Sequence, residues 1–585
     1  MWKPMLLTLV DEMPLGNNWV YEVKYDGFRC GLEWAEEGVK LWSRNGNDFT
    51  AQFPEITAWC EEHAKSIKSY LPLFLDGELV VLDSELKGNF SLIQTRGRMS
   101  SKDRIRSVSQ KRPATFMAFD LLQFKGKSLE NQLLHKRRSQ LEELFNELDL
   151  GSFSYNERLN VVKQYGYPQK IWQDVQLHQG EGVVAKNERS KVTSGERSEQ
   201  WQKVKNWRTV TGFLTKWNME NDYFDVSVYR ISELILLGKL KHGFSDEQKE
   251  TLKAFIYENG EKINTKTWEI PPSVCIELHC LEAKDHELRE PVFHQFRFDL
   301  EPGDCTWERV REGLGQLPES VEISKPNKLL FKQFNKRDFV LYLREVAPLL
   351  LPRLQNKRLT MIRFPDGVED HSFYQKHLPD YAPDFIQTVP GDEEDEDIIC
   401  QDLQTLLWFG NHAAIEYHVP FNTIDSELPD EMVFDLDPPT LKQFPLAVFA
   451  AQLIKEMCEH QGYDVYVKTS GKTGLQLHIP LDEELTYDDT REFMEAVAKV
   501  LVEKYPDQFT IERLKKNRGN RLYIDYIQHA PGKTIIAPYS PRATKEGTVA
   551  TPLFWDEVND SLDPRDYTMD VISKRLNERG CPFWR

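Results

Sequence analysis

The sequence has few cysteines, and their spacing suits neither a zinc site nor a disulfide framework. Eight cysteines are scattered singly along 585 residues, the closest pair (Cys275 and Cys280) lies five positions apart, and no C-x-x-C occurs. Structural zinc sites and disulfide scaffolds need more closely grouped cysteines. We therefore expect buried or idle thiols in a reducing compartment.

Long hydrophobic runs are also missing. No stretch approaches the ~18 consecutive apolar residues that a membrane span needs. The early segment "MLLTLV" (5–10) is too short for a signal-peptide core, and two acids follow it at once. We expect a cytoplasmic protein without membrane contact and, at ordinary domain sizes, with three or four domains.

The net charge of −19 argues against nucleic-acid binding over the whole surface. It does not exclude DNA, because two segments concentrate positive charge: "TRGRMSSKDRIRSVSQKR" (95–112) and "RLKKNRGNR" (513–521). These clusters are candidates for contacts with DNA phosphates, and solvated loops are the alternative.

The pattern of short strands and helices divides the chain into a multidomain α+β protein. Residues 1–208 mix β-patterned and helical runs, whereas 209–308 contain short strands at the spacing of a small barrel. Residues 309–325 are expected to form a linker. Residues 326–585 again mix helices and strands, so we predict three domains.

The segment "WVYEVKYDGFRC" (19–30) predicts a strand that ends in a tight turn. Side chains alternate along a strand, so Val20, Glu22 and Lys24 share one face. Asp26-Gly27 between apolar-rich runs is a strong hairpin signal. Lys24 is then either a solvated charge near a turn or a nucleophile.

Five further segments place charged or aromatic residues on short strands in a fixed order. They are "LWSRNG" with Arg44, "FLDGELVVLD" with Glu78, "TFMAFDLLQF" with Phe119, "EGVVAKNE" with Glu181 and Lys186, and "WQKVKNW" with Lys203 and Lys205. Each has an ordinary structural explanation by itself. Together, in this order, they resemble the covalent nucleotidyltransferase superfamily of ATP-dependent DNA ligases and capping enzymes.

The chemistry of that superfamily suits these residue types. A lysine that attacks the α-phosphorus of ATP must be neutral, and its unperturbed pKa is ~10.4. We expect partial burial and nearby Arg29, Lys203 and Lys205 to lower the pKa of Lys24. Carboxylates suit divalent cations, and an aromatic ring can stack on adenine.

The resemblance implies a lysyl-AMP intermediate on Lys24, with ATP and Mg²⁺ or Mn²⁺ as cofactors. The implied ATP-binding residues are Glu22, Lys24, Arg29, Arg44, Glu78, Phe119, Lys186, Lys203 and Lys205, and the implied metal ligands are Glu78 and Glu181. In ligases an OB-fold β-barrel follows the last lysine-bearing strand, and residues 209–308 fit that place. Arg297 and Asp299 in "LREPVFHQFRFDLEP" either orient pyrophosphate or form a surface ion pair.

A second group of residues suggests a two-metal site. "EMVFDLDPP" (431–439) puts Asp435 and Asp437 on one face of a strand that two prolines end, and "RLYIDYIQ" (521–528) supplies Asp525. Three such carboxylates can bind metal ions and balance their positive charge, while the metals bridge a triphosphate and a primer 3′-oxygen. Strand-end acids that face water are the alternative.

The stretch "VYVKTSGKTGLQLHIPL" (465–481) contains a Ser470-Gly471-x-x-Gly474 loop that can offer backbone N–H groups to phosphates, without the spacing of a P-loop. With "DLDPP" and "APYSPRA…TPLFWDEV", it makes nearly all of 326–560 resemble the primase-type polymerase domain of bacterial DNA ligase D. The resemblance implies three sets of residues: Asp435, Asp437 and Asp525 for metals; His418, Ser470, Gly471 and Arg542 for the triphosphate; and Lys328, Lys336, Arg363, Phe373 and Tyr374 for the DNA 5′-phosphate and template.

The sequence departs from that family at two positions. The family commonly has Ser-Gly-x-Lys-Gly-Leu-His, whereas Thr473 replaces the lysine here and Gln476 the histidine. Lys472 and His478 lie nearby, and the sequence leaves open whether they substitute. Triphosphate affinity could therefore be altered.

The resemblance predicts an ATP-dependent DNA ligase fused to a gap-filling DNA/RNA polymerase that acts in double-strand-break repair by non-homologous end joining. Its expected partners are double-stranded DNA with nicks, gaps or ends, ATP, NTPs or dNTPs, and the DNA-end-binding protein Ku, in the nucleoid of a bacterial cytoplasm. Two alternatives remain: a ligase or capping-like guanylyltransferase with a degenerate polymerase module, and a scaffold whose polymerase module only binds 5′-phosphorylated DNA ends.

Overall fold

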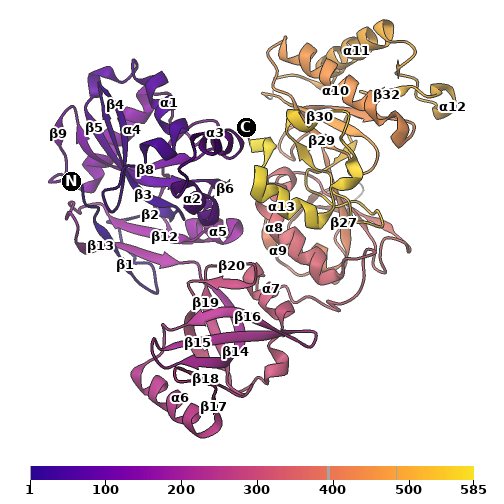
Figure 1. The fold of residues 1–585 in the computed structure, drawn as a ribbon. Coiled ribbons are helices and arrows are strands. Elements are labelled where there is room, and N and C mark those ends of the chain that lie inside the picture. The colour runs from indigo at the N-terminus through magenta and orange to yellow at the C-terminus, as the bar shows by residue number, and fades with distance from the viewer. Residues whose placement is uncertain (1, 392–394, 483, 585) are drawn as a thin grey trace. The chain divides into compact units, whose positions relative to one another are not determined.

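The computed structural model describes residues 2–391, 395–482 and 484–584. It divides into two compact units, residues 1–317 and 318–585 (Figure 1). Among these described residues no helix is long and apolar enough to cross a membrane. All eight cysteines are free and buried, which confirms the prediction of buried thiols.

Two sheets build the first part of the first unit. One is five-stranded, in the order β1 (Leu6–Leu9), β13 (Arg197–Lys205), β12 (Gly182–Asn187), β2 (Trp19–Lys24), β11 (Gln164–Tyr165). The other runs β10 (Leu159–Val161), β8 (Thr115–Phe124), β5 (Leu73–Val80), β3 (Phe28–Ala35), β4 (Gly38–Ser43), with β9 (Lys127–Ser128) beside β8. A short hairpin of β6 (Leu82–Ser84) and β7 (Lys87–Gly88) follows β5.

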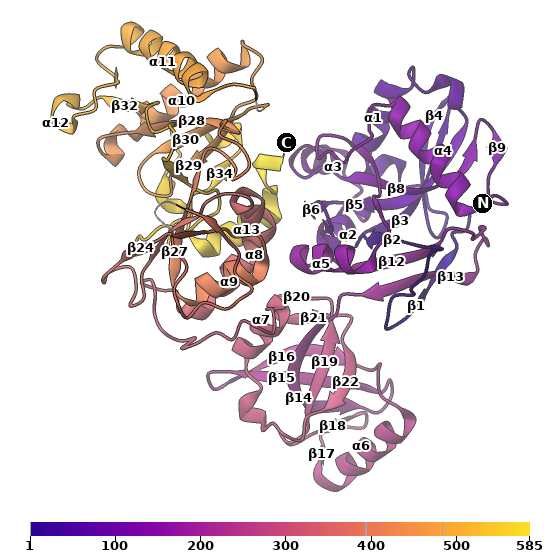
Figure 2. The same ribbon diagram turned by 180° about the vertical axis from the view of Figure 1, so that it is seen from behind.

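Helices cover the outer faces of these sheets. They are α1 (Pro54–His63), α2 (Phe90–Gly97), α3 (Lys102–Lys111), α4 (Leu134–Glu147) and α5 (Pro168–His178). Apolar residues of α1 and α4 form one core with β3, β5 and β8 (Figure 2). Residues of α5 form a second core with β2 and β12. The polar faces of the two sheets are left for the site described below.

The predicted hairpin at Asp26-Gly27 is wrong, although the chain does turn there. Strand β2 pairs with β11 and β12, whereas β3 pairs with β4 and β5 in the other sheet. The turn therefore carries the chain from one sheet to the next. Gly27 passes so close to β5 that an added Cβ would lie 2.2 Å from the Leu79 carbonyl oxygen, which explains the glycine.

The rest of the first unit is β-rich, as predicted, but its strands do not form a continuous barrel. They are β14 (Arg208–Asn218), β15 (Tyr223–Arg230), β16 (Glu233–Leu240), β17 (Glu261–Lys262), β18 (Thr267–Glu269), β19 (Cys275–Cys280) and β22 (Val292–Phe296). Strands β16, β17 and β22 lie at the ends of the strand order. Within residues 208–315, all of which are described, the sheet closes only through one parallel bridge of His242 with Val292.

Two α-helices and one hairpin complete this part. Helix α6 (Asp246–Asn259) follows β16, and hairpin β20 (Glu282–Lys284)–β21 (Glu287–Arg289) projects between β19 and β22. Helix α7 (Trp307–Gly315) packs on β14, so the segment 309–325, which we predicted as linker, begins inside a helix.

Two sheets also form the second unit. The larger runs β31 (Phe509–Thr510), β32 (Leu522–Asp525), β28 (Glu431–Asp437), β30 (Leu475–Pro480), β29 (Tyr466–Thr469), β34 (Pro552–Leu553). The smaller runs β24 (Phe373–Gln375), β23 (Thr360–Arg363), β27 (Ala414–Pro420), β33 (Thr534–Ile536). A separate pair joins β25 (Thr388–Pro390) and β26 (Glu396–Ile398).

The larger sheet has one apolar and one polar face. The helices of the unit are α8 (Lys336–Leu354), α9 (Leu403–Asn411), α10 (Phe444–Glu459), α11 (Tyr487–Lys504), α12 (Lys515–Arg518) and α13 (Met569–Arg579). Helices α10 and α11 cover the face that carries Phe434, Leu436 and Leu477 (Figure 1). Since side chains alternate, Asp435 and Asp437 point to the opposite face.

Candidate active sites

Lys24 lies at the end of β2 and faces a carboxylate. Its Nζ donates to Glu181 Oε2 across 2.6 Å, and 18% of its side chain remains exposed. Gly182 stands opposite Lys24 in the register of β12, where an added Cβ would lie 2.1 Å from the Val204 carbonyl oxygen. The glycine brings the strands together and lets Glu181, just before β12, reach the amine.

The environment raises the pKa of Lys24 rather than lowering it. Burial lowers this pKa, but Glu181, Glu78 and Asp26 together raise it by more than burial lowers it. Our expectation weighed partial burial and the cations Arg29, Lys203 and Lys205 and omitted the carboxylates. Burial and the neighbouring acids in turn raise the pKa of Glu78 to about 8.

Phe119 lies under two cations. The Arg29 guanidinium sits 4.2 Å and the Lys186 ammonium 4.3 Å from the ring centroid. Asp76 holds Arg29 through two hydrogen bonds of 2.6 and 2.7 Å. Glu22 holds Lys186, with its Oε2 2.5 Å from Nζ. Four of the residues predicted to bind ATP, Glu22, Arg29, Phe119 and Lys186, thus meet between the two sheets.

Register brings the remaining lysines to the same face. Lys24 and Lys205 flank Gly182 on its two neighbouring strands, and Glu22 and Lys203 flank Val184 in the same way. Burial, Lys24 and Lys205 lower the pKa of Lys203. Arg44, by contrast, is exposed in the turn that follows β4, and no contact places it in this group.

Two residues at the edge of this site escaped the sequence analysis. Arg289 on β21 forms an ion pair with Asp26, with Nη2 2.7 Å from Oδ1, and Glu290 pairs with Lys205. The "LREP" segment that carries Arg289 and Glu290 was the available signal, but we singled out its other arginine. That arginine, Arg297, forms an ion pair with Asp299, with Nη2 2.7 Å from Oδ2.

We expect Glu181→Gln to shift the pH profile of lysine adenylation to lower pH. The neutral amine is the nucleophile, so below its pKa the rate rises tenfold per pH unit. Removing the carboxylate deletes the strongest charge that raises the pKa of Lys24, so this pKa should fall, although Glu78 and Asp26 still raise it. Single-turnover formation of the AMP adduct between pH 6 and 9 measures this. Glu181→Asp keeps the charge and should keep the profile; an unshifted Glu181→Gln profile would contradict the assignment.

The predicted acids of the second unit converge as the strand pattern indicates. Asp435 stands opposite Asp525 in the register of β28 and β32, and Asp437 stands two residues further along the same face. Burial, Asp437 and Asp525 raise the pKa of Asp435 to about 7. Burial and Asp525 likewise raise the pKa of Asp437.

The donor chemistry of this group fits a divalent cation. Three hard oxygen donors whose mutual repulsion opposes ionisation would be stabilised by a cation between them. As the side chains lie, however, no three Asp, Glu, His or Cys groups among the described residues already form a metal-binding cluster.

Gln476, one of the two departures, connects the acids to a buried lysine. Its Nε2 donates to Asp435 Oδ1 across 3.2 Å, and its Oε1 accepts from Lys468 Nζ. Register places Asp525, Asp435, Gln476 and Lys468 in one row across four strands. Burial lowers the pKa of Lys468 to about 7. His478, which the sequence offered as a possible substitute, instead contacts Glu431, with Nδ1 2.8 Å from Oε2.

The residues predicted for the triphosphate come from three segments. His418 lies on β27, Ser470 and Gly471 form the turn between β29 and β30, and Arg542 follows β33. Arg542 Nη1 donates to the Ser470 carbonyl oxygen across 3.2 Å, which joins two of these segments. The Ser470 hydroxyl accepts from the Gly474 N–H across 3.0 Å and so shapes the loop.

The residues predicted for DNA form two groups. Lys336, at the start of α8, donates to Ser324 Oγ across 3.1 Å, and nearby Lys328 is among the charges that lower its pKa. Arg363 is buried beneath Phe373, 5.1 Å from its ring centroid. Phe373 and Tyr374 are 37% and 72% exposed, so both rings are open to a base.

The first basic segment is only partly available to DNA. Arg96 and Arg112 are buried in ion pairs with Glu55 and Asp83. The exposed cations nearby are Arg98, Lys102, Arg104, Arg106 and Lys111.

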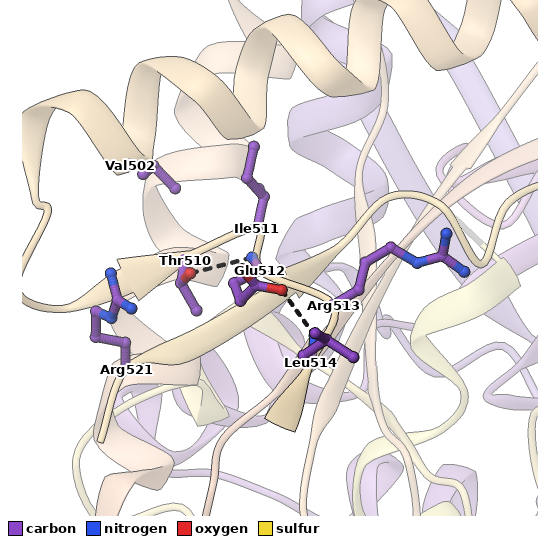
Figure 3. A pocket seen from close by; sticks show the side chains of 7 residues that line it. All are labelled: Val502, Thr510, Ile511, Glu512, Arg513, Leu514 and Arg521. Carbon is purple, nitrogen blue, oxygen red and sulfur yellow. Dashed lines mark hydrogen bonds between the residues drawn. The ribbon is translucent and has the colours of Figure 1, made fainter. Parts of the chain in front are cut away.

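The second basic segment, 513–521, borders a pocket of about 680 Å³. Arg513 and Arg521 lie on opposite sides of this pocket (Figure 3). Arg518 and Arg521 donate to backbone carbonyl oxygens of the segment itself, which leaves Arg513, Lys515 and Lys516 for phosphates. None of the predicted site residues lines this pocket.

Comparison with protein families identifies the class of each unit. Residues 4–205 match the family described as "ATP dependent DNA ligase domain", and residues 335–583 match "LigD, primase-polymerase domain". The chain therefore combines a DNA ligase and a primase-type polymerase, in that order.

The chain belongs to the LigD family. It is 38% identical over 582 residues to the bifunctional non-homologous end joining protein LigD of Bacillus subtilis, and the match covers 98% of this chain and 95% of that protein. The multifunctional LigD of Pseudomonas aeruginosa is 25% identical over 98% of this chain and 71% of its own. The polymerase domain of Mycobacterium tuberculosis ligase D, solved in complex with DNA, is 27% identical, with a TM-score of 0.42 over 45% of this chain and 96% of that one.

Proposed function

We propose that this chain fills and seals breaks in double-stranded DNA at two separate nucleotidyl-transfer sites, one in each unit. Its partners would be DNA with nicks, gaps or ends, ATP, and NTPs or dNTPs. The names of the relatives support a role in end joining, where the end-binding protein Ku would be a further partner.

The observation that carries the ligase site is the position of Lys24. Its Nζ would attack the α-phosphorus of ATP while pyrophosphate leaves, and Glu181, 2.6 Å away, is placed to take its proton. AMP would then pass to the 5′-phosphate of a nick, and the 3′-hydroxyl would displace it. Lys203 and Lys205 would stabilise the phosphates.

In the second unit, Asp435, Asp437 and Asp525 would hold Mg²⁺ or Mn²⁺, and Glu78 and Glu181 would do so in the first. A bound divalent cation neutralises phosphate charge and stabilises the leaving group. His418, Ser470, Gly471 and Arg542 would bind the incoming triphosphate. Lys328, Lys336 and Arg363 would hold the DNA 5′-phosphate end, and Phe373 and Tyr374 would stack on the template.

A duplex with a one-nucleotide gap and a 5′-phosphate tests this function. With ATP, NTPs and either metal, we expect a product that is one nucleotide longer and then sealed to full length. A 5′-hydroxyl gap should be filled poorly and never sealed. Sealing without filling, or neither product with either metal, would contradict the proposal.

A further inference from the structure

A buried carboxylate that belongs to none of the predicted sites collects three hydrogen-bond partners and an ion-paired lysine in the second unit. Glu416 on β27 is 2% exposed. Its Oε1 accepts from the Ala543 N–H at 3.0 Å and from Arg542 Nε at 3.2 Å, and it forms an ion pair with Lys472 Nζ at 3.2 Å. Its Oε2 lies 3.0 Å from His418 Nε2.

These groups come from segments far apart in the sequence, and backbone geometry locks the segments together. Gly471 has a φ of +72°, and an added Cβ would lie 2.5 Å from Arg542 Cγ. The Thr548 hydroxyl donates to the Gly471 carbonyl oxygen. The loop that carries Lys472 is thus pressed against the segment that carries Arg542, and Glu416 lies where their side chains meet.

The charges of the cluster do not balance. The donors around Glu416 lower its pKa despite burial, so the carboxylate is ionised. An ionised carboxylate only accepts hydrogen bonds, so His418 donates from Nε2 and keeps Nδ1 free. One anion then faces two cations, Arg542 and Lys472, which leaves one net positive charge.

The three side chains around Glu416 are also the ones that reach solvent. Lys472 is 45% exposed, His418 17% and Arg542 13%, while Glu416 lies behind them. Arg542 uses Nε and Nη1 on protein oxygens, and no hydrogen bond of Nη2 to another described residue occurs. We call His418, Lys472 and Arg542 the cradle. Its net positive charge and free donors, with the buried Glu416 behind them, are suited to bind a polyanion.

We propose that Glu416 is a positioning residue that holds His418, Lys472 and Arg542 in one triphosphate cradle, and that Lys472 is itself a triphosphate contact. This rests on the proposed polymerase function. Fixing the cations before the nucleotide arrives lowers the ordering cost of binding. The arrangement also supplies a lysine to the triphosphate from position 472 of the loop. Position 473, where the family commonly has a lysine, is a threonine here.

Lys472→Ala is the decisive variant, because a half-exposed lysine can be removed without disturbing the core. With a gapped 5′-phosphorylated duplex, we expect the KM for the nucleotide to rise about tenfold, as for one lost charged contact, with kcat changed less than twofold. Lys472→Arg should restore most of the KM, and Thr473→Ala, the matched control on the same exposed turn, should match the wild type. An unchanged KM in Lys472→Ala, or no recovery in Lys472→Arg, overturns the role of Lys472.

Glu416→Gln tests the positioning role, because glutamine keeps the shape and removes the charge. We expect the KM for the nucleotide to rise at least fivefold. If repulsion between Glu416 and phosphate dominated instead, the KM would fall, and that result overturns the positioning role. A lower melting temperature with an unchanged KM would mean a purely structural role and overturns it too.

Failure of the proposed function can be told apart from failure of this inference. Wild-type protein that never extends a primer defeats the function itself. Wild-type extension combined with an unchanged KM in Lys472→Ala defeats only the cradle. Covalent AMP labelling of Lys24 in the same preparations confirms that the first unit is folded, and the melting temperature of each variant reports on the second.

Discussion

Lys24→Ala removes covalent labelling of the chain by α-labelled ATP down to background, and nick sealing is lost with it. The predicted effect is complete because the label is attached to Lys24 itself. Lys186, on the neighbouring strand β12, is a poor substitute because it is 2% exposed, bound to Glu22 and packed against Phe119 and Trp201, and Lys205 is held in an ion pair with Glu290. Lys24 combines partial exposure with a carboxylate that can take its proton.

Peptide mapping of the labelled wild-type protein provides the control. The label should lie in the peptide that contains Lys24 and should be unchanged in Lys127→Ala, which removes an exposed lysine on β9. Label that survives in Lys24→Ala, or that maps to the peptide of Lys186, would show that the nucleophile is misassigned.

Asp435→Asn combined with Asp437→Asn abolishes primer extension and leaves adenylation of Lys24 intact. These acids occupy the polar face of β28 opposite Asp525, and loss of two of the three removes the ligands of any metal there. Extension of a labelled primer on a gapped duplex and AMP labelling in the same sample measure both results. Persistent extension would show that the metal ligands are misassigned.

The same variant should melt no lower than the wild type at pH 8. Burial and the neighbouring acids raise the pKa of Asp435 to about 7, above its usual 3.8. An acid with a raised pKa in the folded state costs stability as pH rises through that range, so the ionised group is unfavourable at pH 8. Asparagine removes that cost. An unchanged or higher melting temperature would therefore show that extension is lost through catalysis and not through unfolding.

Local alternation predicted which side chains share a face. The spacing of Glu22 and Lys24, and of Lys203 and Lys205, placed each pair on one side of its strand, and the register brings both pairs together. The same rule placed Asp435 beside Asp437. These predictions succeeded because the period of a strand is a property of the backbone itself.

Strand partners and charge balance depend on contacts distant in sequence, and there the predictions failed. Asp26-Gly27 has the local signature of a hairpin, but β2 and β3 pair in different sheets. Whether the pKa of Lys24 is raised or lowered depends on Glu181, which only the fold brings within 2.6 Å of the amine. Glu416 gave no signal, because the groups that meet it come from three segments: β27, the loop with Lys472, and residues 542–543.

The most direct test of two independent sites in one chain uses a gapped, 5′-phosphorylated duplex with ATP and NTPs. Lys24→Ala alone should fill the gap and leave a nick, whereas Asp435→Asn with Asp437→Asn should leave the gap open yet seal a ready-made nick. An equimolar mixture of the two variants should restore the sealed product. If Lys24→Ala cannot fill the gap, or the mixture yields no sealed strand, the account of two separable nucleotidyl-transfer sites is wrong.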